Sequence, residues 1–525
     1  MVDIARMNLS EGGILIRCAV STIDAPFGMG VFFRRAEGHR SYRQSELRNQ
    51  KHSIEGHCRL DWRSEITEST PQFALTFSIN ARLNREPPFD KNGYFSADCF
   101  VLTFDNTIAP AMKPFLSLPL SASITVLFYA ISLASEAYWP EWRGPNRDGH
   151  VEYFDPPSQW PKSLANDWRI EVGEGSAMPL IAEGSVYQHA RQGGDEVVWK
   201  IDLESGKVLW RQNYRVPYRI SSPGERHGDG PLSNPAYAEG RLFTFSVTGV
   251  LSAWNAESGE LLWRKDYADR FDITHPHWGH STSPLVDGEQ VIVHFGGDHA
   301  GILVAMDVTT GKVIWSDDTD GACHASPIIV ELKGIRQIVE WNHNAVVGFE
   351  SGTGKRLWEY PLQHTGSNQN SPTPVFRKGR LLIGGENRGI RSLEPKLVNG
   401  QWEVIENWHQ RRASLNMASA VASGDSLYGK SHFKQGQFFR LDIETGDIVW
   451  TGPARMGEFA SFLVVDEHLI ALRDDATIEV IPVGESEYRS IATYEVAESP
   501  TWAAPVLLKD GILVKDRRTL FKWSF

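Results

Sequence analysis

Short apolar segments alternate with polar turns over most of the chain, and one such pattern recurs. The segment 201–210 reads Ile-Asp-Leu-Glu-Ser-Gly-Lys-Val-Leu-Trp, and similar segments occupy 254–263, 306–315, 349–358 and 441–450. In each copy a strand ends, a polar turn with a glycine follows, and alternating apolar positions begin the next strand. In most copies the turn opens with Asp or Asn, whose side chain accepts hydrogen bonds from turn amides. The pattern predicts a β-hairpin that closes on a tryptophan.

A second recurring element precedes the hairpins, in which a proline opens one strand and a glycine-containing turn leads into another. It occupies 179–187, 235–243, 284–291, 374–382 and 505–513. Proline suits the first position of a strand because it has no N–H group to give to the sheet. Together the two elements predict four strands in each unit.

The aromatic residue that ends each unit sets the period of the repeat. We interpret five tryptophans as packing anchors that lie between neighbouring sheets: Trp210, Trp263, Trp315, Trp358 and Trp450. A degenerate unit ends at Trp408 and a seventh near Tyr494, so successive anchors are 42 to 53 residues apart. Periods of this length, built from strands without a helical pattern between them, predict an all-β fold, a β-propeller of four-stranded antiparallel blades.

An eighth unit is divided between the two ends of the repeat region. Residues 502–525 supply three strands, and 168–172 reads as an outer strand with no unit before it. Pairing of these two segments would close the ring and remove its exposed edges. We therefore predict an eight-bladed propeller over 168–525 after an N-terminal lead segment at 138–167. A seven-bladed ring is the alternative.

The beginning of the chain differs in composition from the repeats. Residues 1–111 hold three of the four cysteines but one of the 18 tryptophans. A short basic start at Met112, an apolar run at 124–133 and small residues up to Ala137 have the order of a secretory signal peptide. Because such a signal acts at the start of a nascent chain, we expect 112–137 to be the signal. Residues 1–111 would then be an over-extended gene model or a disordered region.

An internal membrane anchor is the alternative interpretation of this apolar run. Its strongly apolar centre, 124–133, is shorter than the roughly 20 residues that a spanning helix needs. We therefore expect an extracytoplasmic protein, periplasmic or secreted, with no transmembrane span in its mature form.

Charge and cysteine content narrow the possible functions. The net charge of -12 disfavours nucleic acid, because binding to phosphates relies on an excess of Lys and Arg. Cys18, Cys58, Cys99 and Cys323 include no CxxC pair that could hold zinc, an iron–sulfur cluster or covalent haem. We expect a monomer whose partner is a protein or a small polar ligand.

Candidate site residues cluster in loops that we expect to face the central funnel of the propeller, where propeller sites usually lie. Imidazoles can bind metals or polar ligands, and arginine suits carboxylate or sugar oxygens. The alternative is that these groups hydrogen-bond loop backbone and one another. No metal motif such as HExxH and no GxSxG nucleophile occurs, so we predict no metal and no catalytic residue. The ligand-binding candidates are His277, His280, His324, His343, Glu386, Asn387 and Arg388.

The repeat resembles that of the pyrroloquinoline-quinone-type (PQQ-like) propeller family, which ends in an aspartate, Thr/Ser-Gly, Lys and Trp, as at 307–315. The segment 139–149 is similar to the opening motif of secreted propellers of this family, which are abundant in planctomycete-like bacteria. One branch of the family, the quinoprotein dehydrogenases, binds the quinone with calcium, and its most typical members carry two adjacent cysteines and an aspartate base. The other branch resembles the propeller subunit of the outer-membrane β-barrel assembly machinery and lacks the cofactor.

This chain has no adjacent cysteines and no position that we can match to the calcium ligands or the aspartate base of the dehydrogenases. We therefore expect a binding or scaffold module with no cofactor and no catalysis of its own. The alternative is a PQQ-dependent oxidoreductase of alcohols or sugars that binds the quinone with calcium. A lectin-like propeller is a third hypothesis, and it would expose Trp278 or Trp341 beside acidic side chains.

The interpretation of the N-terminal region predicts the first residue of the mature protein. Cleavage after Ala137 leaves Tyr138 at the amino terminus. N-terminal sequencing of the native protein checks this, and Met1 as the first residue would contradict it.

Overall fold

The computed structural model describes residues 137–221, 224–364 and 369–525 in full, together with the backbone of six strands nearer the amino terminus. The chain divides into two units, Met1–Val126 and Leu127–Phe525. Apart from Ala137, the expected signal peptide lies outside the described residues and stays a prediction, as does our interpretation of 1–111. The first unit contains two antiparallel three-stranded sheets, which are β1 (Asp3–Arg6), β2 (Arg17–Ser21) and β3 (Phe32–Phe33), and β4 (Glu55–Leu60), β5 (Phe77–Arg82) and β6 (Leu102–Phe104).

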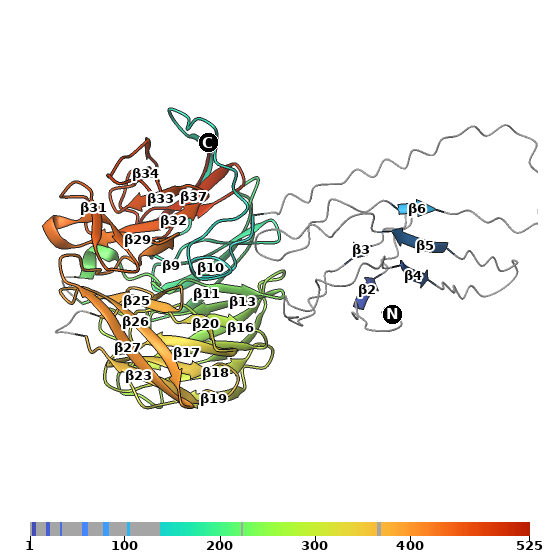
Figure 1. Cartoon of the computed structure of the whole chain (residues 1–525), viewed down its shortest axis with the longest axis horizontal. Coiled ribbons are helices and arrows are strands. Elements are labelled where there is room, and N and C mark those ends of the chain that lie inside the picture. The colour runs from blue at the N-terminus through green and yellow to red at the C-terminus, as the bar shows by residue number, and fades with distance from the viewer. Residues whose placement is uncertain are drawn as a thin grey trace, which may run out of the picture. The chain divides into compact units, whose positions relative to one another are not determined.

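The second unit contains eight four-stranded antiparallel sheets arranged as the blades of a ring (Figure 1). In blades 1 to 7 the four strands follow one another in sequence from the axis outward. The strands of the first four blades are β8 (Leu180–Ala182), β9 (Ser185–Gln192), β10 (Asp195–Asp202) and β11 (Val208–Arg215); β12 (Ala236–Ala238), β13 (Arg241–Phe245), β14 (Leu251–Asn255) and β15 (Leu261–Lys265); β16 (Leu285–Asp287), β17 (Gln290–Gly296), β18 (Gly301–Asp307) and β19 (Val313–Asp317); and β20 (Ile328–Leu332), β21 (Ile335–Trp341), β22 (Ala345–Glu350) and β23 (Arg356–Pro361).

The next three blades repeat this order, and two short 3-10 helices lie in loops. The strands are β24 (Val375–Arg377), β25 (Arg380–Gly384), β26 (Ile390–Val398) and β27 (Gln401–Gln410); β28 (Val421–Ser423), β29 (Ser426–Ser431), β30 (Gln437–Asp442) and β31 (Ile448–Thr451); and β32 (Ala460–Val465), β33 (His468–Arg473), β34 (Thr477–Pro482) and β35 (Ala492–Glu495). The helices are η1 (Gly224–His227) and η2 (Phe433–Gln435). Among the described residues, no helix is both long and apolar enough to cross a membrane.

The eighth blade joins the two ends of the repeat region, as predicted. Its inner strands are β36 (Val506–Leu507), β37 (Gly511–Lys515) and β38 (Thr519–Ser524), and its outer strand is β7 (Ala165–Glu171), which pairs antiparallel with β38. The prediction of an all-β, eight-bladed propeller is confirmed, and the seven-bladed alternative is wrong.

Apolar side chains fill every interface between neighbouring blades. The largest cluster is continuous across blades 7, 8, 1 and 2, and it includes Leu463, Leu513, Leu180 and Tyr237. Five further clusters fill the remaining interfaces around the ring. Blade 8, which joins the two ends of the repeat region, is therefore held by a shared apolar core as well as by backbone hydrogen bonds.

The tryptophan that ends one blade packs on the glycine turn of the next. Gly259 has φ of +75°, and an added Cβ there would lie 2.8 Å from Trp210 Cδ2, so the indole covers the turn. Trp210 Nε1 also donates a hydrogen bond to Ala256 O at 3.0 Å in the same turn. Trp168, Trp263, Trp315 and Trp408 pack in the same way on Gly206, Gly311, Gly354 and Gly446 of the following blades.

The exceptions are Trp358 and Trp450, because the corresponding glycines of the next blades, Gly400 and Gly484, have no side chain packed on them. In blade 5 this glycine lies in the long hairpin β26–β27, and Trp358 donates to Gln337 Oε1 within its own blade at 2.7 Å. Trp450 instead donates to Glu485 O of blade 7 at 3.1 Å. Both side chains are buried, so all five predicted anchors pack, but Trp358 does so against its own sheet.

The lead segment crosses the axis of the ring and fastens to every blade. Its arginines carry much of this contact, because each guanidinium donates several hydrogen bonds in fixed directions. Arg147 is buried and pairs with Glu141 Oε2 at 2.6 Å. The segment's hydrogen bonds run from Trp139 N to Ile181 O (blade 1), from Tyr237 N to Pro140 O (2), from Arg147 to Pro284 O (3) and Pro327 O (4), from Trp142 Nε1 to Thr373 Oγ1 (5), from Arg143 Nη2 to Ala420 O (6), from Val464 N to Gly149 O (7) and from Tyr153 Oη to Leu507 O (8).

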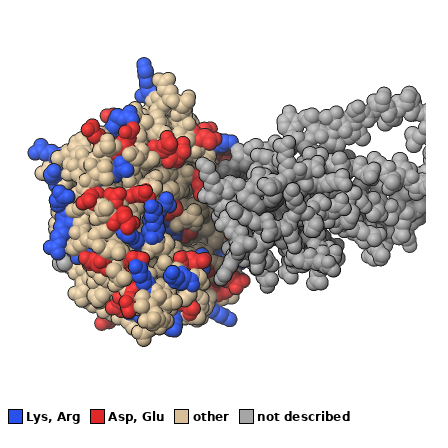
Figure 2. Space-filling model, in the orientation of Figure 1, with Lys and Arg blue, Asp and Glu red and all other residues tan. Residues whose placement is uncertain are grey.

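Charged side chains of both signs are interspersed over the visible face of the propeller (Figure 2). Some charged side chains also pair between neighbouring blades, including Arg336 with Asp287 at 2.7 Å and Arg270 with Asp318 at 2.8 Å. Exposed pairs of this kind contribute about 1 kcal/mol or less each. The apolar interfaces and the lead segment therefore dominate the cohesion of the ring.

Two glycines separate the role of tryptophan packing from that of backbone conformation. Gly259 and Gly240 have nearly the same φ, +75° and +74°, but an added Cβ meets Trp210 at Gly259 and nothing within 4 Å at Gly240. Gly240→Ala should cost about 1–2 kcal/mol of unfolding free energy, from left-handed strain alone. Gly259→Ala should cost about 1–3 kcal/mol more, because the indole must move. Urea unfolding measures both, and equal destabilisation would contradict the proposed packing role.

Candidate functional site

A cavity of about 550 Å³ opens at the centre of the ring, at the amino-terminal ends of the innermost strands. The segment just before the innermost strand of every blade contributes to its wall. One such residue from each blade is Ser176, Asn234, Ser281, Ser326, Thr373, Ser419, Phe459 and Ala504. A volume of this size is typical of small-molecule sites.

The lead segment forms the floor of this cavity. Trp142 lines it, and its Nε1 donates to Thr373 Oγ1 at 2.8 Å. The adjacent Arg143 is anchored to Ala420 O at 2.7 Å, so two neighbouring blades hold the backbone that carries Trp142. The channel thus ends in a fixed aromatic surface.

The loop that carries η1 crosses the mouth of the cavity. The rings of His227 and Trp502 meet edge to face with centroids 4.2 Å apart. Arg226 Nη1 lies 2.9 Å from Glu458 Oε1, and Gly224 packs against the indole of Trp278. This loop between blades 1 and 2 therefore touches loops that precede blades 3, 7 and 8.

Three of the seven predicted site residues line the cavity: His277, His324 and Glu386. His324 Nε2 donates to His277 O at 3.2 Å, which ties the loops before blades 3 and 4 together. Burial lowers the pKa of His324 to about 4, so the ring is neutral near physiological pH. Glu386 lies in the turn between β25 and β26, and no hydrogen bond joins its side chain to the described residues around it.

The other four predicted residues lie outside the cavity lining. His280 is fully buried, where its Nε2 donates to Thr274 O at 2.9 Å and burial lowers its pKa. Asn387 Oδ1 accepts from His432 Nε2 at 3.0 Å. Arg388 Nη1 donates to Gln363 O at 2.6 Å. These side chains therefore hydrogen-bond to groups of the surrounding loops. This is the alternative that the sequence left open.

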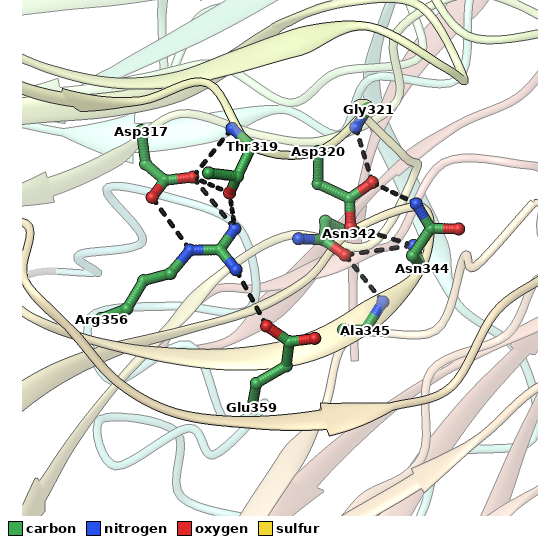
Figure 3. A network of polar contacts seen from close by, with 9 residues as sticks. All are labelled: Asp317, Thr319, Asp320, Gly321, Asn342, Asn344, Ala345, Arg356 and Glu359. Atoms are coloured by element: carbon green, nitrogen blue, oxygen red, sulfur yellow. Dashed lines mark hydrogen bonds and ion pairs between the residues drawn. The ribbon is translucent and has the colours of Figure 1, made fainter.

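His343 belongs to a network that fixes the loop between β21 and β22. Asn344 Nδ2 donates to Asp320 Oδ1 at 2.6 Å, and Asn342 Oδ1 accepts from Ala345 N at 2.8 Å (Figure 3). His343 itself is buried, and its Nε2 lies 2.8 Å from Nε2 of His364. Beside this network Arg356 forms a bidentate pair with Asp317, also drawn in Figure 3. The polar motif at 341–344 thus binds the segment that connects blades 3 and 4, and the Arg356–Asp317 pair joins the two blades.

Trp341 is not exposed, as the hypothesis of a lectin-like site would require. Its exposed fraction is 0%, its Nε1 donates to Leu362 O at 3.0 Å, and the guanidinium of Arg388 lies 5.0 Å from its ring. It cannot serve as an exposed platform, because the side chain is core. Trp278, the other candidate, does line the cavity.

Several cavity residues escaped the sequence analysis, among them Trp142, Arg226, His227, Asn416 and Trp502. The sequence did contain a signal for Trp502, which lies three residues before the strand-opening Pro505. Residues in the same place before Pro235, Pro284 and Pro374 also line the cavity. Arg226 and His227 had no such signal, since they reach the cavity from a long irregular loop.

The described lining of the cavity offers few ligands for the calcium of a calcium–quinone pair. Glu386 is the one carboxylate among the described lining residues, whereas calcium takes six to eight oxygen ligands. No group of three or more His, Cys, Asp or Glu in the fully described part of the chain has a geometry that could hold a metal ion. Cys323 is buried and its Sγ donates to Gln369 Oε1 at 3.1 Å, so it presents no thiol to the cavity.

The fold defines an eight-bladed β-propeller, and comparisons with known proteins show that its sequence is similar to PQQ-like propellers. A family model described as outer membrane protein assembly factor BamB matches residues 194–452. The resemblance to the PQQ-like repeat family that the sequence predicts is thus confirmed.

The relatives of this chain include both branches of the family. Outer membrane protein assembly factor BamB of Shewanella oneidensis is 23% identical over 226 residues, which are 41% of this chain and 55% of the relative. Polyvinylalcohol dehydrogenase of a Sphingopyxis species is 24% identical over 270 residues, which are 48% of this chain and 36% of the relative. The chain therefore spans little more than half the length of the first relative and about a third of the second.

A solved europium-containing methanol dehydrogenase superposes with a TM-score of 0.56 at 12% identity, covering 74% of this chain and 98% of that one. At this identity the likeness shows the shared fold alone.

The partly buried imidazole of His324 predicts a contribution to acid sensitivity. Its pKa in the folded state is about 4, below the ordinary value of about 6.5. Between these pH values the unfolded chain binds a proton that the folded chain does not, so stability falls as the pH drops through this window. His324→Gln should make this fall shallower, as measured by urea unfolding at a series of pH values. Ser281→Ala, which alters the same cavity without removing an imidazole, should keep the wild-type slope; an unchanged slope in His324→Gln would contradict the assignment.

Proposed function

We propose that this protein is an extracytoplasmic PQQ-like β-propeller that acts as a binding module, with no catalysis of its own. The ligand is a protein or a small polar molecule, and the central cavity is its site. The observation that carries the proposal is the composition of that cavity. Its described lining is mostly aromatic and uncharged polar, with Glu386 as its one carboxylate, Arg226 paired with Glu458, and a floor made by Trp142.

A binding site needs fewer features than a catalytic site, and the cavity has the features that binding needs. Binding needs a shaped hollow with a few directed polar groups. A catalytic site would also need a nucleophile or an acid–base pair within hydrogen-bond reach. His324 and Cys323, the nearest candidates, donate to His277 O and Gln369 Oε1, so neither is held by a second catalytic group.

The likeness to BamB supports an extracytoplasmic location and allows for a protein partner. Relatives of that name are described as outer membrane protein assembly factors. The signal peptide expected at 112–137 agrees with export. We propose a monomer, since closure of the ring by β7 and β38 leaves no blade incomplete.

A PQQ-dependent oxidoreductase of alcohols or sugars is the second candidate. The observation in its favour is the presence of quinohemoprotein and polyvinylalcohol dehydrogenases among the relatives. Against it stands the donor set of the cavity, which offers one carboxylate and no exposed cysteine in the described residues.

Titration with pyrroloquinoline quinone and calcium distinguishes the two candidates. We expect no saturable binding to the purified full chain at tens of micromolar quinone, and no dye reduction with alcohols or sugars, because the cavity lacks the carboxylates that would hold the metal. Isothermal calorimetry and absorbance give the readouts. Stoichiometric binding with turnover would contradict the proposal and make the protein a dehydrogenase without the usual cysteine pair.

A further inference from the structure

Three tryptophans bring flat apolar surfaces into one small cavity. Trp142 forms the floor, Trp278 stands on the side of blade 3, and Trp502 stands between blades 7 and 8. All three are partly exposed even though the ring offers dry interfaces for packing. Large aromatic side chains left partly open in a hollow mark a surface that a ligand with an apolar face can cover.

Most polar side chains around the cavity are already occupied by the fold. Gln369 Nε2 donates to Asp298 Oδ1 at 3.0 Å, and Asn234 Nδ2 donates to Ser283 Oγ at 2.9 Å. A smaller set has no side-chain hydrogen bond within the described residues, and it includes Ser176, His277, Ser281, Glu386 and Asn416. These groups offer hydroxyl, imidazole, carboxylate and amide positions to a ligand.

The charges of the lining restrict what the ligand can be. Arg226 is committed to Glu458 by the ion pair at the cavity mouth. Burial lowers the pKa of both His227 and His324, so these imidazoles are neutral near physiological pH. An anionic ligand would therefore meet the carboxylate of Glu386 without an uncommitted Lys or Arg among the described lining residues.

From these features we infer that the cavity binds a neutral saccharide. Sugar rings combine apolar C–H faces, which the indoles can cover, with hydroxyls that both donate and accept hydrogen bonds. A carboxylate accepts hydrogen bonds from such hydroxyls strongly, which assigns Glu386 as the central polar contact. The volume of about 550 Å³ limits the bound part to a small saccharide. This inference rests on the proposed binding function and names its ligand.

Calorimetric and tryptophan-fluorescence titrations of the full chain with D-glucose, cellobiose and N-acetylglucosamine test the inference. We expect at least one of these probes to bind saturably at millimolar concentration or below, and to change the fluorescence because three tryptophans line the cavity. Glu386→Gln should weaken binding by about tenfold or more, since a hydrogen bond to a charged group is lost. Trp502→Ala should abolish it.

The matched control is Glu403→Gln, which removes an exposed carboxylate from β27 far from the cavity lining. It should bind as the wild type does, and thermal unfolding should show that all variants are folded. Unchanged affinity in Glu386→Gln, or no saturation by any saccharide, would overturn the inference.

An additional probe separates this inference from the function on which it rests. Saturable binding of benzoate, an aromatic anion, in place of saccharides would overturn the saccharide assignment and leave the binding module standing. Binding of pyrroloquinoline quinone with turnover would overturn both.

Discussion

The ring depends on a short segment that does not belong to any blade. Residues 139–153 hydrogen-bond to the innermost strand of each of the eight blades or to the residues just before it. Around the axis of a propeller, backbone carbonyls would otherwise face an open channel, and the buried guanidiniums of Arg143 and Arg147 supply donors for them. Glu141 neutralises Arg147, and Arg143 donates to the backbone oxygens of Asp148 and Ala420.

This axial contact and the tryptophan packing act at opposite ends of each blade. At the rim, an indole rests on the glycine turn of the next blade. At the axis, the lead segment ties the blades to one another. The cavity lies above that tie, so its floor, Trp142, is held by the same hydrogen bonds that close the ring. A binding site placed in this way is fixed by rigid elements while its mouth is bordered by loops.

Much of the fold could be predicted because its determinants are local and repeated. The Asp-to-Gly turn, the strand-opening proline and the terminal tryptophan each define a piece of hairpin, and their recurrence fixes the blade number. The closure by β7 followed from one unpaired strand at each end. The axial role of the lead segment could not be predicted, since its contacts join residues that are far apart in sequence, such as Arg143 and Ala420.

The site was harder to predict for the same reason. The candidate histidines lie in loops at the cavity end of the ring, but such a loop can turn its side chain either way. His277 and His324 reach the cavity, whereas His280 and His343 are buried between blades. Trp341 is the last residue of β21, whose final five residues are all buried, and it therefore belongs to the core. Arg226 and His227 reach the cavity only through the path of an irregular loop.

Native-state hydrogen exchange across the lead segment tests most directly whether the ring depends on it. The amides of Trp139 and Gly149 and of the partners Ile181 and Val464 are predicted to exchange as slowly as the central strands, through global unfolding alone. Exchange of Trp139 and Gly149 at the rate of exposed loops, with the blades still protected, would contradict this and leave the cavity without a fixed floor.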